Sequence, residues 1–177
     1  MKRFLILGLL FTLNSFAKTY TIKKGNHYSS GVHVGLFHND ELNIKVTFDD
    51  SAKYKNVLPA NQWAVNKLFG FSDCTSSHHK NSARFGWRWV NSKLELMAYN
   101  YVNSQRLEIK LGEMGLNQAH DMKIKIKKAK YIFSFNGKDI EMARGCSSKK
   151  ANGYKLYPYF GGSETAPQEI KIKIDKE

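Results

Sequence analysis

Apolar and polar residues alternate along most of this chain with a period of two residues. In residues 41–48 (ELNIKVTF), Leu42, Ile44, Val46 and Phe48 share one face, and polar side chains occupy the other. Because successive side chains of a β-strand point to opposite faces, this pattern predicts a strand with one buried side. The same pattern recurs in residues 18–24, 82–90, 93–102, 106–111, 121–128, 131–135, 139–143, 153–160 and 169–174. No segment shows the spacing of an amphipathic helix.

Short turn signals separate the predicted strands. The pair Asn136-Gly137 lies between two of them and is typical of a two-residue hairpin turn in which both residues take positive φ. About ten short strands joined by turns predict an antiparallel β-sandwich of the jelly-roll type. We expect residues 18–177 to form a single domain. The exception to the pattern is residues 49–81, which we expect to be one long loop with one or two helical turns in residues 59–69.

The first residues predict a secretory signal peptide, residues 1–17. Lys2 and Arg3 are followed by a short apolar run and then by small side chains that end at Ala17. This order of positive, apolar and small residues predicts cleavage between Ala17 and Lys18. The run is far shorter than the roughly 20 apolar residues of a membrane-spanning helix. We therefore expect a secreted or periplasmic protein without a transmembrane segment.

The chain is strongly basic, with a formal net charge of +13 at pH 7. Cleavage of the signal peptide lowers this charge by two. Such a charge indicates anionic partners, and among these we favour an extracellular polysaccharide or an anionic cell surface over nucleic acid. The lysines alternate along the predicted strands, so they also fit the simpler interpretation of solvated strand faces. We expect the mature chain to be a monomer.

Cys74 and Cys146 are the two cysteines of the chain. In an exported protein they are expected to pair, and the disulfide would close a long loop. In the chain-entropy description such a bridge contributes about 4 kcal/mol to stability. Two alternatives stay open, namely free buried thiols and Cys74 as one ligand of a metal ion.

The region richest in arginine and aromatic residues is the hairpin of residues 82–102. Its predicted core face carries Phe85, Trp87 and Trp89, opposite Leu94, Leu96 and Ala98 of the next strand. Cross-strand pairing then brings the residues of the other face into one patch, namely Arg84, Arg88, Glu95, Met97, Tyr99 and Tyr101. Guanidinium groups bind carboxylates in a bidentate way, and tyrosine rings suit sugars. The patch therefore predicts a glycan-binding site, unless Arg84 and Arg88 only pair with Glu95.

A second aromatic stretch, YPYFGG at residues 157–162, ends in two glycines that permit a tight turn. We expect Tyr157 and Tyr159 to line the rim of the sandwich and to bind ligand by stacking. The alternative is that the stretch packs as a closing strand, with Pro158 at an edge position.

Two groups of residues have side chains that bind metal ions in other proteins. Four acids at the ends of the strand at residues 41–48 offer oxygen ligands for calcium, namely Asp40, Glu41, Asp49 and Asp50. Their spacing matches no defined loop motif, and turn formation is the favoured interpretation. Cys74 with His78 or His79 is an incomplete zinc set. No cofactor is therefore predicted, with calcium as the alternative.

The sequence contains no motif of a common catalytic site. It has no acid pair on one strand of the kind that glycosidases use, no serine elbow and no glycine loop for phosphate. A polysaccharide lyase is harder to exclude, because it needs a cation to neutralise the uronate carboxylate and a tyrosine or histidine to take the proton. The residues that offer these groups are Arg84, Arg88, Tyr99, Tyr101 and His79. We assign no catalytic residue and favour a binding protein over an enzyme.

Two blocks, NKLFGFSDCTSSHHKNSARFGWRWVNSKLELMAYNY and YKLYPYFGGSETAPQEIKIKI, resemble a group of small secreted bacterial proteins without an assigned activity. That group is similar in outline to the concanavalin-like jelly rolls of lectins, glycan-binding modules and polysaccharide lyases. The resemblance covers residues 45–174 and implies the fold and export. It implies no catalytic residues, because the acid pair of sandwich glycosidases and the full arginine, glutamine–histidine and tyrosine motifs of sandwich alginate lyases are not matched. Cys74 and Cys146 lie in or beside these blocks, which fits a structural bridge.

These patterns predict a secreted binding module for an extracellular anionic glycan or cell-envelope polymer. One alternative is a polysaccharide lyase, which would release unsaturated uronates from an acidic polysaccharide. The other is a structural envelope protein whose basic faces rest on an anionic surface. Binding by such a protein should fall steeply with salt and show no sugar preference.

Overall fold

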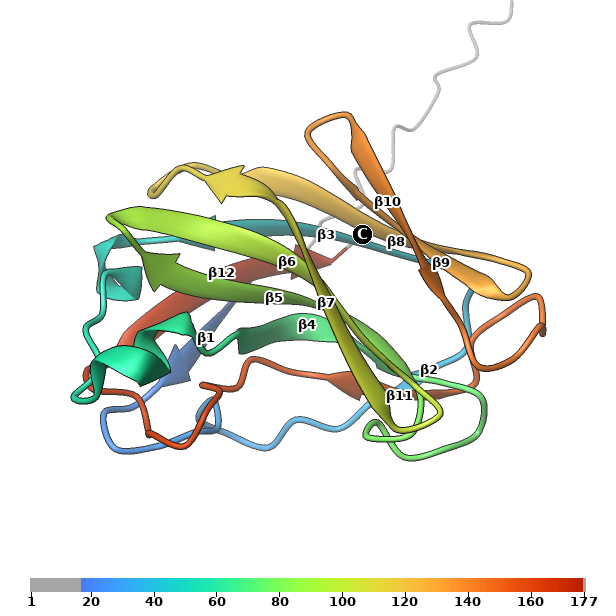
Figure 1. The fold of residues 1–177 in the computed structure, drawn as a ribbon, viewed down its shortest axis with the longest axis horizontal. Helices are drawn as coiled ribbons and strands as arrows, with labels where there is room; N and C mark the ends of the chain where they lie inside the picture. The colour runs from blue at the N-terminus through green and yellow to red at the C-terminus, as the bar shows by residue number, and fades with distance from the viewer. Residues whose placement is uncertain (1–16, 177) are drawn as a thin grey trace, which may run out of the picture.

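The structure, a computed structural model, describes residues 17–176 and consists of two antiparallel β-sheets packed face to face (Figure 1). One sheet, the β3 sheet, has the strand order β1 (Lys18–Ile22), β12 (Ile170–Lys176), β3 (Glu41–Phe48), β8 (His120–Lys127), β9 (Lys130–Phe135) and β10 (Lys138–Ala143). The other, the β5 sheet, has the order β2 (Leu36–Phe37), β11 (Gly153–Leu156), β4 (Asn66–Ser72), β5 (Ser82–Val90), β6 (Lys93–Val102) and β7 (Gln105–Met114). The predicted antiparallel all-β sandwich is confirmed.

The core lies between the two sheets and is built from the inward positions of the alternating strands. β3 alternates half-buried and buried residues along its whole length. On the facing sheet, Phe85 and Trp87 are fully buried, and the Trp87 ring centre lies 4.9 Å from that of Phe48. Trp89 is half-buried and packs against the same core, so the predicted core face of the β5–β6 hairpin is confirmed. Burial of one such aromatic side chain contributes on the order of 2 kcal/mol.

Two-residue turns join several neighbouring strands. Asn136 and Gly137 have φ angles of 48° and 74° and connect β9 to β10, as the sequence predicts. Asn91-Ser92 and Asn103-Ser104 also have positive φ at both positions and connect β5 to β6 and β6 to β7. The twist of such turns matches that of the flanking strands. They keep β5, β6 and β7 in close antiparallel register, so their outward side chains form one surface.

Residues 49–81 are not the single long loop that the sequence suggested. The 3-10 helices η1 (Asp50–Ala52) and η2 (Pro59–Trp63) occupy its first part, and β4 follows them and pairs with β5. The alternation of β4 is hidden because a β-bulge between Lys67 and Gly70 shifts its register against β5. A Cβ atom at position 70 would lie only 2.4 Å from a Cα atom of β5, so this close approach requires glycine.

Residues 1–16 and 177 lie outside the described residues, so the signal peptide and its cleavage site stay predictions. The assignment of residues 18–177 to one domain also stays a prediction. Among the described residues, no helix has the length and apolar character needed to cross a membrane.

Candidate ligand-binding groove

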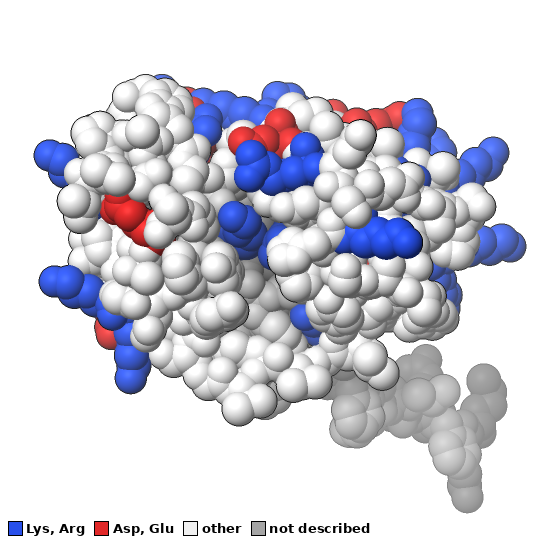
Figure 2. Space-filling view, turned by 60° about the horizontal axis from the view of Figure 1, so that its bottom comes forward, with Lys and Arg blue, Asp and Glu red and all other residues white. Residues whose placement is uncertain are grey.

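The β5 sheet carries a groove of ≈ 840 Å³ on the face turned away from the core. In Figure 2, basic side chains stand around the hollowed middle of the visible face. The positively charged residues that line the groove are Lys67, Arg84, Arg106 and Lys155, and the tyrosines are Tyr28, Tyr99, Tyr101, Tyr154, Tyr157 and Tyr159. Within residues 17–176, no aspartate or glutamate lines it. The groove is therefore cationic and aromatic.

Arg84 of β5 lies in the groove lining and is almost completely buried, with 6% of its surface exposed. Its guanidinium carbon lies 5.2 Å from the centre of the buried Tyr99 ring. Its Nε atom has no hydrogen-bond partner among the described residues, and burial lowers the pKa of Arg84. Arginine nevertheless stays protonated. A buried cation without a counter-charge destabilises the free protein, and an anionic ligand would remove that penalty.

Lys67 of β4 faces the same part of the groove. Its Nζ atom lies 5.4 Å from the ring centre of Tyr99 and 5.9 Å from that of Tyr159. Burial, together with the charges of Arg84 and Arg106, lowers the pKa of Lys67 to about 8. Three cations thus repel one another around one region of the groove. An anion bound there would raise the pKa of Lys67 again and favour its charged form.

One wall of the groove contains a hydrogen-bonded pair, His78 and Tyr154. Nδ1 of His78 lies 2.8 Å from the Tyr154 hydroxyl, and that hydroxyl accepts a hydrogen bond from the His78 backbone N–H at 3.1 Å. Burial, with contributions from His79 and Arg84, lowers the pKa of His78 to about 4. The imidazole is therefore neutral at pH 7. A neutral imidazole beside a hydroxyl is an arrangement that is able to relay a proton.

The second arginine of β5, Arg88, lies outside the groove lining and is paired. Its Nε donates to Glu95 at 2.7 Å, and Lys110 of β7 donates to the other oxygen of Glu95 at 2.6 Å. Burial opposes ionisation of Glu95, but the hydrogen bonds from Lys110 and Arg88 outweigh it and lower the pKa. Between the two arginines of β5, a Cβ atom at Gly86 would lie 2.5 Å from a methyl group of Val65. Val65 thus packs onto β5 between the two arginines.

The groove brings together most of the predicted ligand-binding residues. Those that line it are Arg84, Tyr99, Tyr101, Tyr157 and Tyr159. Arg88 and Glu95 do not line it, because they form an ion pair with each other across β5 and β6. Of the single patch predicted on the hairpin, Arg84, Tyr99 and Tyr101 line the groove, whereas Arg88, Glu95 and Met97 do not. The pairing with Glu95, which the sequence analysis held as the alternative for both arginines, is formed by Arg88. The role of these residues in ligand binding stays a prediction.

Several residues that line the groove were not predicted from the sequence. Lys67 lies in β4, a strand concealed within the expected long loop. Arg106 lies directly opposite Tyr101 on β7, so cross-strand pairing of the predicted patch was the signal that could have found it. Tyr154 and Lys155 belong to β11, within a stretch whose alternation was recognised but whose position beside β4 was not.

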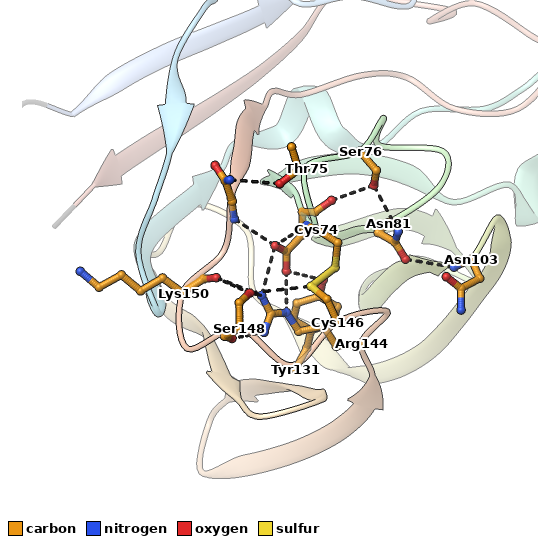
Figure 3. The surroundings of a disulfide bond; sticks show 12 residues. Cys74, Thr75, Ser76, Asn81, Asn103, Tyr131, Arg144, Cys146, Ser148 and Lys150 are labelled. Atoms are coloured by element: carbon orange, nitrogen blue, oxygen red, sulfur yellow. Dashed lines mark hydrogen bonds and ion pairs between the residues drawn. A yellow bond between two sulfur atoms is a disulfide. The ribbon is translucent and has the colours of Figure 1, made fainter.

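The loop of residues 73–81, which forms one groove wall, is fixed at its start by a disulfide and a buried ion pair (Figure 3). The bond between Cys74 and Cys146 confirms the predicted bridge. Next to it, Asp73 accepts a hydrogen bond from Arg144 at 2.6 Å, and both side chains are fully buried. These contacts tie the loop to the segment that follows β10 and give the groove wall a fixed position.

Several of the residues considered as metal ligands have other partners. Asp49 caps η1 by accepting a hydrogen bond from the Ser51 backbone N–H at 2.9 Å, and Asp50 pairs with Lys53. This capping agrees with the interpretation of these acids as turn residues. Within the described part of the chain, the one close group of three ligand-type side chains is Asp73, Cys74 and Cys146. The disulfide occupies both of these sulfur atoms, so the alternative of Cys74 as a metal ligand is wrong.

No protein-family profile matches the sequence, and a search of curated proteins found no match. The structure is similar to that of the alginate lyase AlyC3, with a TM-score of 0.58 and 16% identity over 89% of this chain and 72% of that chain. It is also similar to SCLam, a non-specific endo-beta-1,3(4)-glucanase from family GH16, with a TM-score of 0.54 and 6% identity over 93% of this chain and 71% of that chain. A lichenase derived from a mouse hindgut metagenome has a TM-score of 0.53 and 9% identity over 91% of this chain and 79% of that chain. These similarities define the fold as a concanavalin-like jelly roll.

Proposed function

We propose that this protein binds an acidic polysaccharide in the groove of the β5 sheet. The observation that carries the proposal is Arg84, a buried cation that has no counter-charge within residues 17–176 and lies in a groove to which this part of the chain contributes no carboxylate. A uronate or sulfate group of a sugar would supply the missing charge and accept hydrogen bonds from the guanidinium fork.

Two further features support a sugar as the carrier of that charge. The groove is lined mainly by tyrosines, whose rings offer flat apolar faces and hydroxyl groups together. Its volume of ≈ 840 Å³ lies in the range of pockets that bind small organic ligands, so part of a glycan chain fits. The named fold neighbours, an alginate lyase and two glucanases, act on polysaccharides, which makes the same ligand class reasonable for this chain.

Titration calorimetry with acidic and neutral oligosaccharides tests the proposal. We expect binding of the acidic oligomers and a loss of at least about tenfold in affinity for Arg84→Gln, since hydrogen bonds to a charged group are worth about 1.5–3 kcal/mol. Lys173→Gln is the matched control, because it removes one positive charge from β12 of the opposite sheet. Its affinity should equal that of the wild type.

Two results would contradict the proposal. One is the absence of binding to any acidic oligosaccharide at low salt. The other is an equal loss of affinity in Arg84→Gln and Lys173→Gln, with a steep salt dependence and no sugar preference. That second result would favour the alternative of a basic envelope protein resting on an anionic surface.

A second candidate function, a polysaccharide lyase, is favoured by the contact between His78 and Tyr154. In such a reaction the base removes the proton on the carbon beside the uronate carboxylate, the bond from the neighbouring carbon to the glycosidic oxygen breaks, and a carbon–carbon double bond forms. The leaving oxygen takes up a proton. Arg84 would stabilise the carboxylate as negative charge develops on it, and neutral His78 with Tyr154 would move the protons.

Ultraviolet absorbance of unsaturated uronates tests this candidate. A lyase produces a rising signal with an acidic polysaccharide, and Tyr154→Phe should abolish the signal while leaving the affinity of the groove within a few-fold of the wild type. A wild-type protein that binds the polymer and yields no unsaturated product would leave the binding module as the function.

We also propose that the mature chain begins at Lys18, is exported and acts as a monomer. The disulfide supports export, because such bonds persist in oxidising compartments. Mass spectrometry of the protein recovered outside the cytoplasm tests the start and the export, and size-exclusion chromatography tests the monomer. A retained N-terminal segment, or a dimer in solution, would contradict them.

A further inference from the structure

Beyond the groove, the 3-10 helix η2 ends in an unusually exposed aromatic side chain, Trp63. It is 53% exposed, whereas Trp87 is fully buried and Trp89 is half-buried against the core. The Arg88 guanidinium carbon lies 5.1 Å from the centre of the Trp63 ring, and Arg88 Nη1 donates to the Trp63 carbonyl oxygen at 3.1 Å. One side of the indole is therefore held by protein, and much of the remainder faces solvent.

The segment that carries Trp63 is fixed by hydrogen bonds. The Glu164 carboxylate accepts from the backbone N–H groups of Val57 and Leu58 at 2.8 and 2.9 Å. Within the same segment, Gln62 donates to the carbonyl oxygen of Trp89 at 2.6 Å. A ring that is already held in place loses little conformational freedom when a ligand packs on it, which favours binding.

Trp63 is joined to the groove through the two residues that follow it in the chain, Ala64 and Val65. The next residue, Ala64, approaches Gly162 of the groove lining so closely that a Cβ atom at Gly162 would lie 2.9 Å from the Ala64 Cβ atom. Val65 follows and packs onto β5, and its carbonyl oxygen accepts a hydrogen bond from the groove residue Lys67 at 2.9 Å. A polymer that leaves the groove over Gly162 would therefore pass Ala64, the chain neighbour of Trp63.

We infer that Trp63 is a second binding site for the same glycan chain, at which the apolar face of one sugar ring stacks on the exposed indole. The inference rests on the proposed function of the groove. Packing against an aromatic ring buries apolar area without requiring a charge on the sugar. This suits the location, because the charge of the adjacent Arg88 is already matched by Glu95. The site therefore selects for chain length, whereas the groove selects for acidic groups.

A length series of acidic oligosaccharides tests this inference by calorimetry. We expect Trp63→Ala to bind short oligomers with the affinity of the wild type and long oligomers about tenfold more weakly. The variant would thus lose the higher affinity that the wild type has for long oligomers. Trp63→Phe should restore most of that advantage. Leu58→Ala is the matched control, because Leu58 is a similarly exposed apolar residue at the start of η2, 58% exposed. In the wild type, tryptophan emission should change with long oligomers only.

The outcomes separate this inference from the proposal for the groove. If the wild type binds no acidic oligomer of any length, both fail. If the wild type binds them and Trp63→Ala keeps the full dependence on length, the second site is refuted and the groove stands. Equal losses for short and long oligomers, or an equal effect of Leu58→Ala, would also refute it, because they indicate a general change in the loop.

Discussion

Two buried arginines in this protein have opposite surroundings. Arg144, beside the disulfide, is 4% exposed and donates to both oxygens of Asp73 and to oxygens of Ser148 and Lys150 (Figure 3). It also donates to the carbonyl oxygen of Lys128 at 3.2 Å, so each nitrogen of its guanidinium group has a partner. Arg84, in the groove, is 6% exposed, and its Nε atom is buried without a hydrogen-bond partner among the described residues. Both arginines are largely buried, but within residues 17–176 only Arg144 has its guanidinium group bound by hydrogen bonds and a counter-charge.

This difference is what the proposed function uses to distinguish a structural arginine, Arg144, from a ligand-binding one, Arg84. Burial of a charge is tolerated when hydrogen bonds and a counter-charge replace water, as they do at Arg144. At Arg84 the guanidinium group lies beside the ring of Tyr99, and a ring replaces only part of what water supplies. Under the proposed function, an anionic ligand would supply the remaining interactions of Arg84.

Removing the counter-charge of Arg144 should have the largest effect on stability. Asp73→Asn leaves a fully buried guanidinium unpaired and should lower the free energy of unfolding by about 3–5 kcal/mol. Urea denaturation with the disulfide intact measures this loss. Asp50→Asn is the control, since Asp50 is an exposed acid whose partners, Lys53 and Asn117, are also at the surface. A loss below that of the control would show that the Asp73–Arg144 pair does not stabilise the fold.

The Asp73–Arg144 ion pair also predicts how the stability of the protein depends on pH. Burial opposes ionisation of Asp73, but hydrogen bonds from Arg144 and Tyr131 outweigh it and hold its pKa below the usual value. Because the folded pKa is the lower one, the stabilisation is fully present above the unfolded pKa of about 4 and is lost as pH falls through the folded value. Urea midpoints between pH 7 and pH 2 should fall more for the wild type than for Asp73→Asn. Parallel curves would contradict this.

Substitution of Glu95, which lies on β6 of the β5 sheet, should have a smaller effect on stability than substitution of Asp73. Glu95→Gln removes the charge that pairs with Arg88 and Lys110, in a partly exposed position, and should lower the free energy of unfolding by about 1 kcal/mol. Because Glu95 does not line the groove, affinity for acidic oligosaccharides should stay within about twofold of the wild type. A loss as large as that of Arg84→Gln would mean that both arginines serve one site.

The smallest expected effect is a pH dependence of binding that arises from Lys67. The pKa of Lys67 in the free protein is lowered to about 8 by burial and by Arg84 and Arg106, with Glu108 opposing them, and a bound anion would raise it. Affinity should therefore be constant below the free pKa and weaken a few-fold above pH 8, where binding must take up a proton. Lys67→Arg keeps its charge and should flatten this profile. An unchanged profile in Lys67→Arg would remove Lys67 from the binding site.

The sequence predicts the sandwich well because alternation depends on one simple property, the burial of every second side chain. Phe85 and Trp87 were placed in the core on this basis alone. The same reasoning treated Arg84 and Arg88 alike, since they share a face of β5. Tertiary contacts distinguish the two arginines. Glu95 pairs with Arg88, and Val65 packs onto β5 at Gly86, between Arg84 and Arg88. Lys67 was missed because the bulge at Gly70 disrupts the alternation of β4.

The stability of Arg84→Met, measured by urea denaturation with and without an acidic oligosaccharide, tests the central claim most directly. Methionine fills similar space without a charge, so the free variant should be more stable than the wild type, by about 1 kcal/mol. The oligosaccharide should then stabilise the wild type and leave the variant unchanged. A variant that is less stable than the wild type and is stabilised equally by the oligosaccharide would show that Arg84 belongs to the architecture of the sheet and not to a ligand.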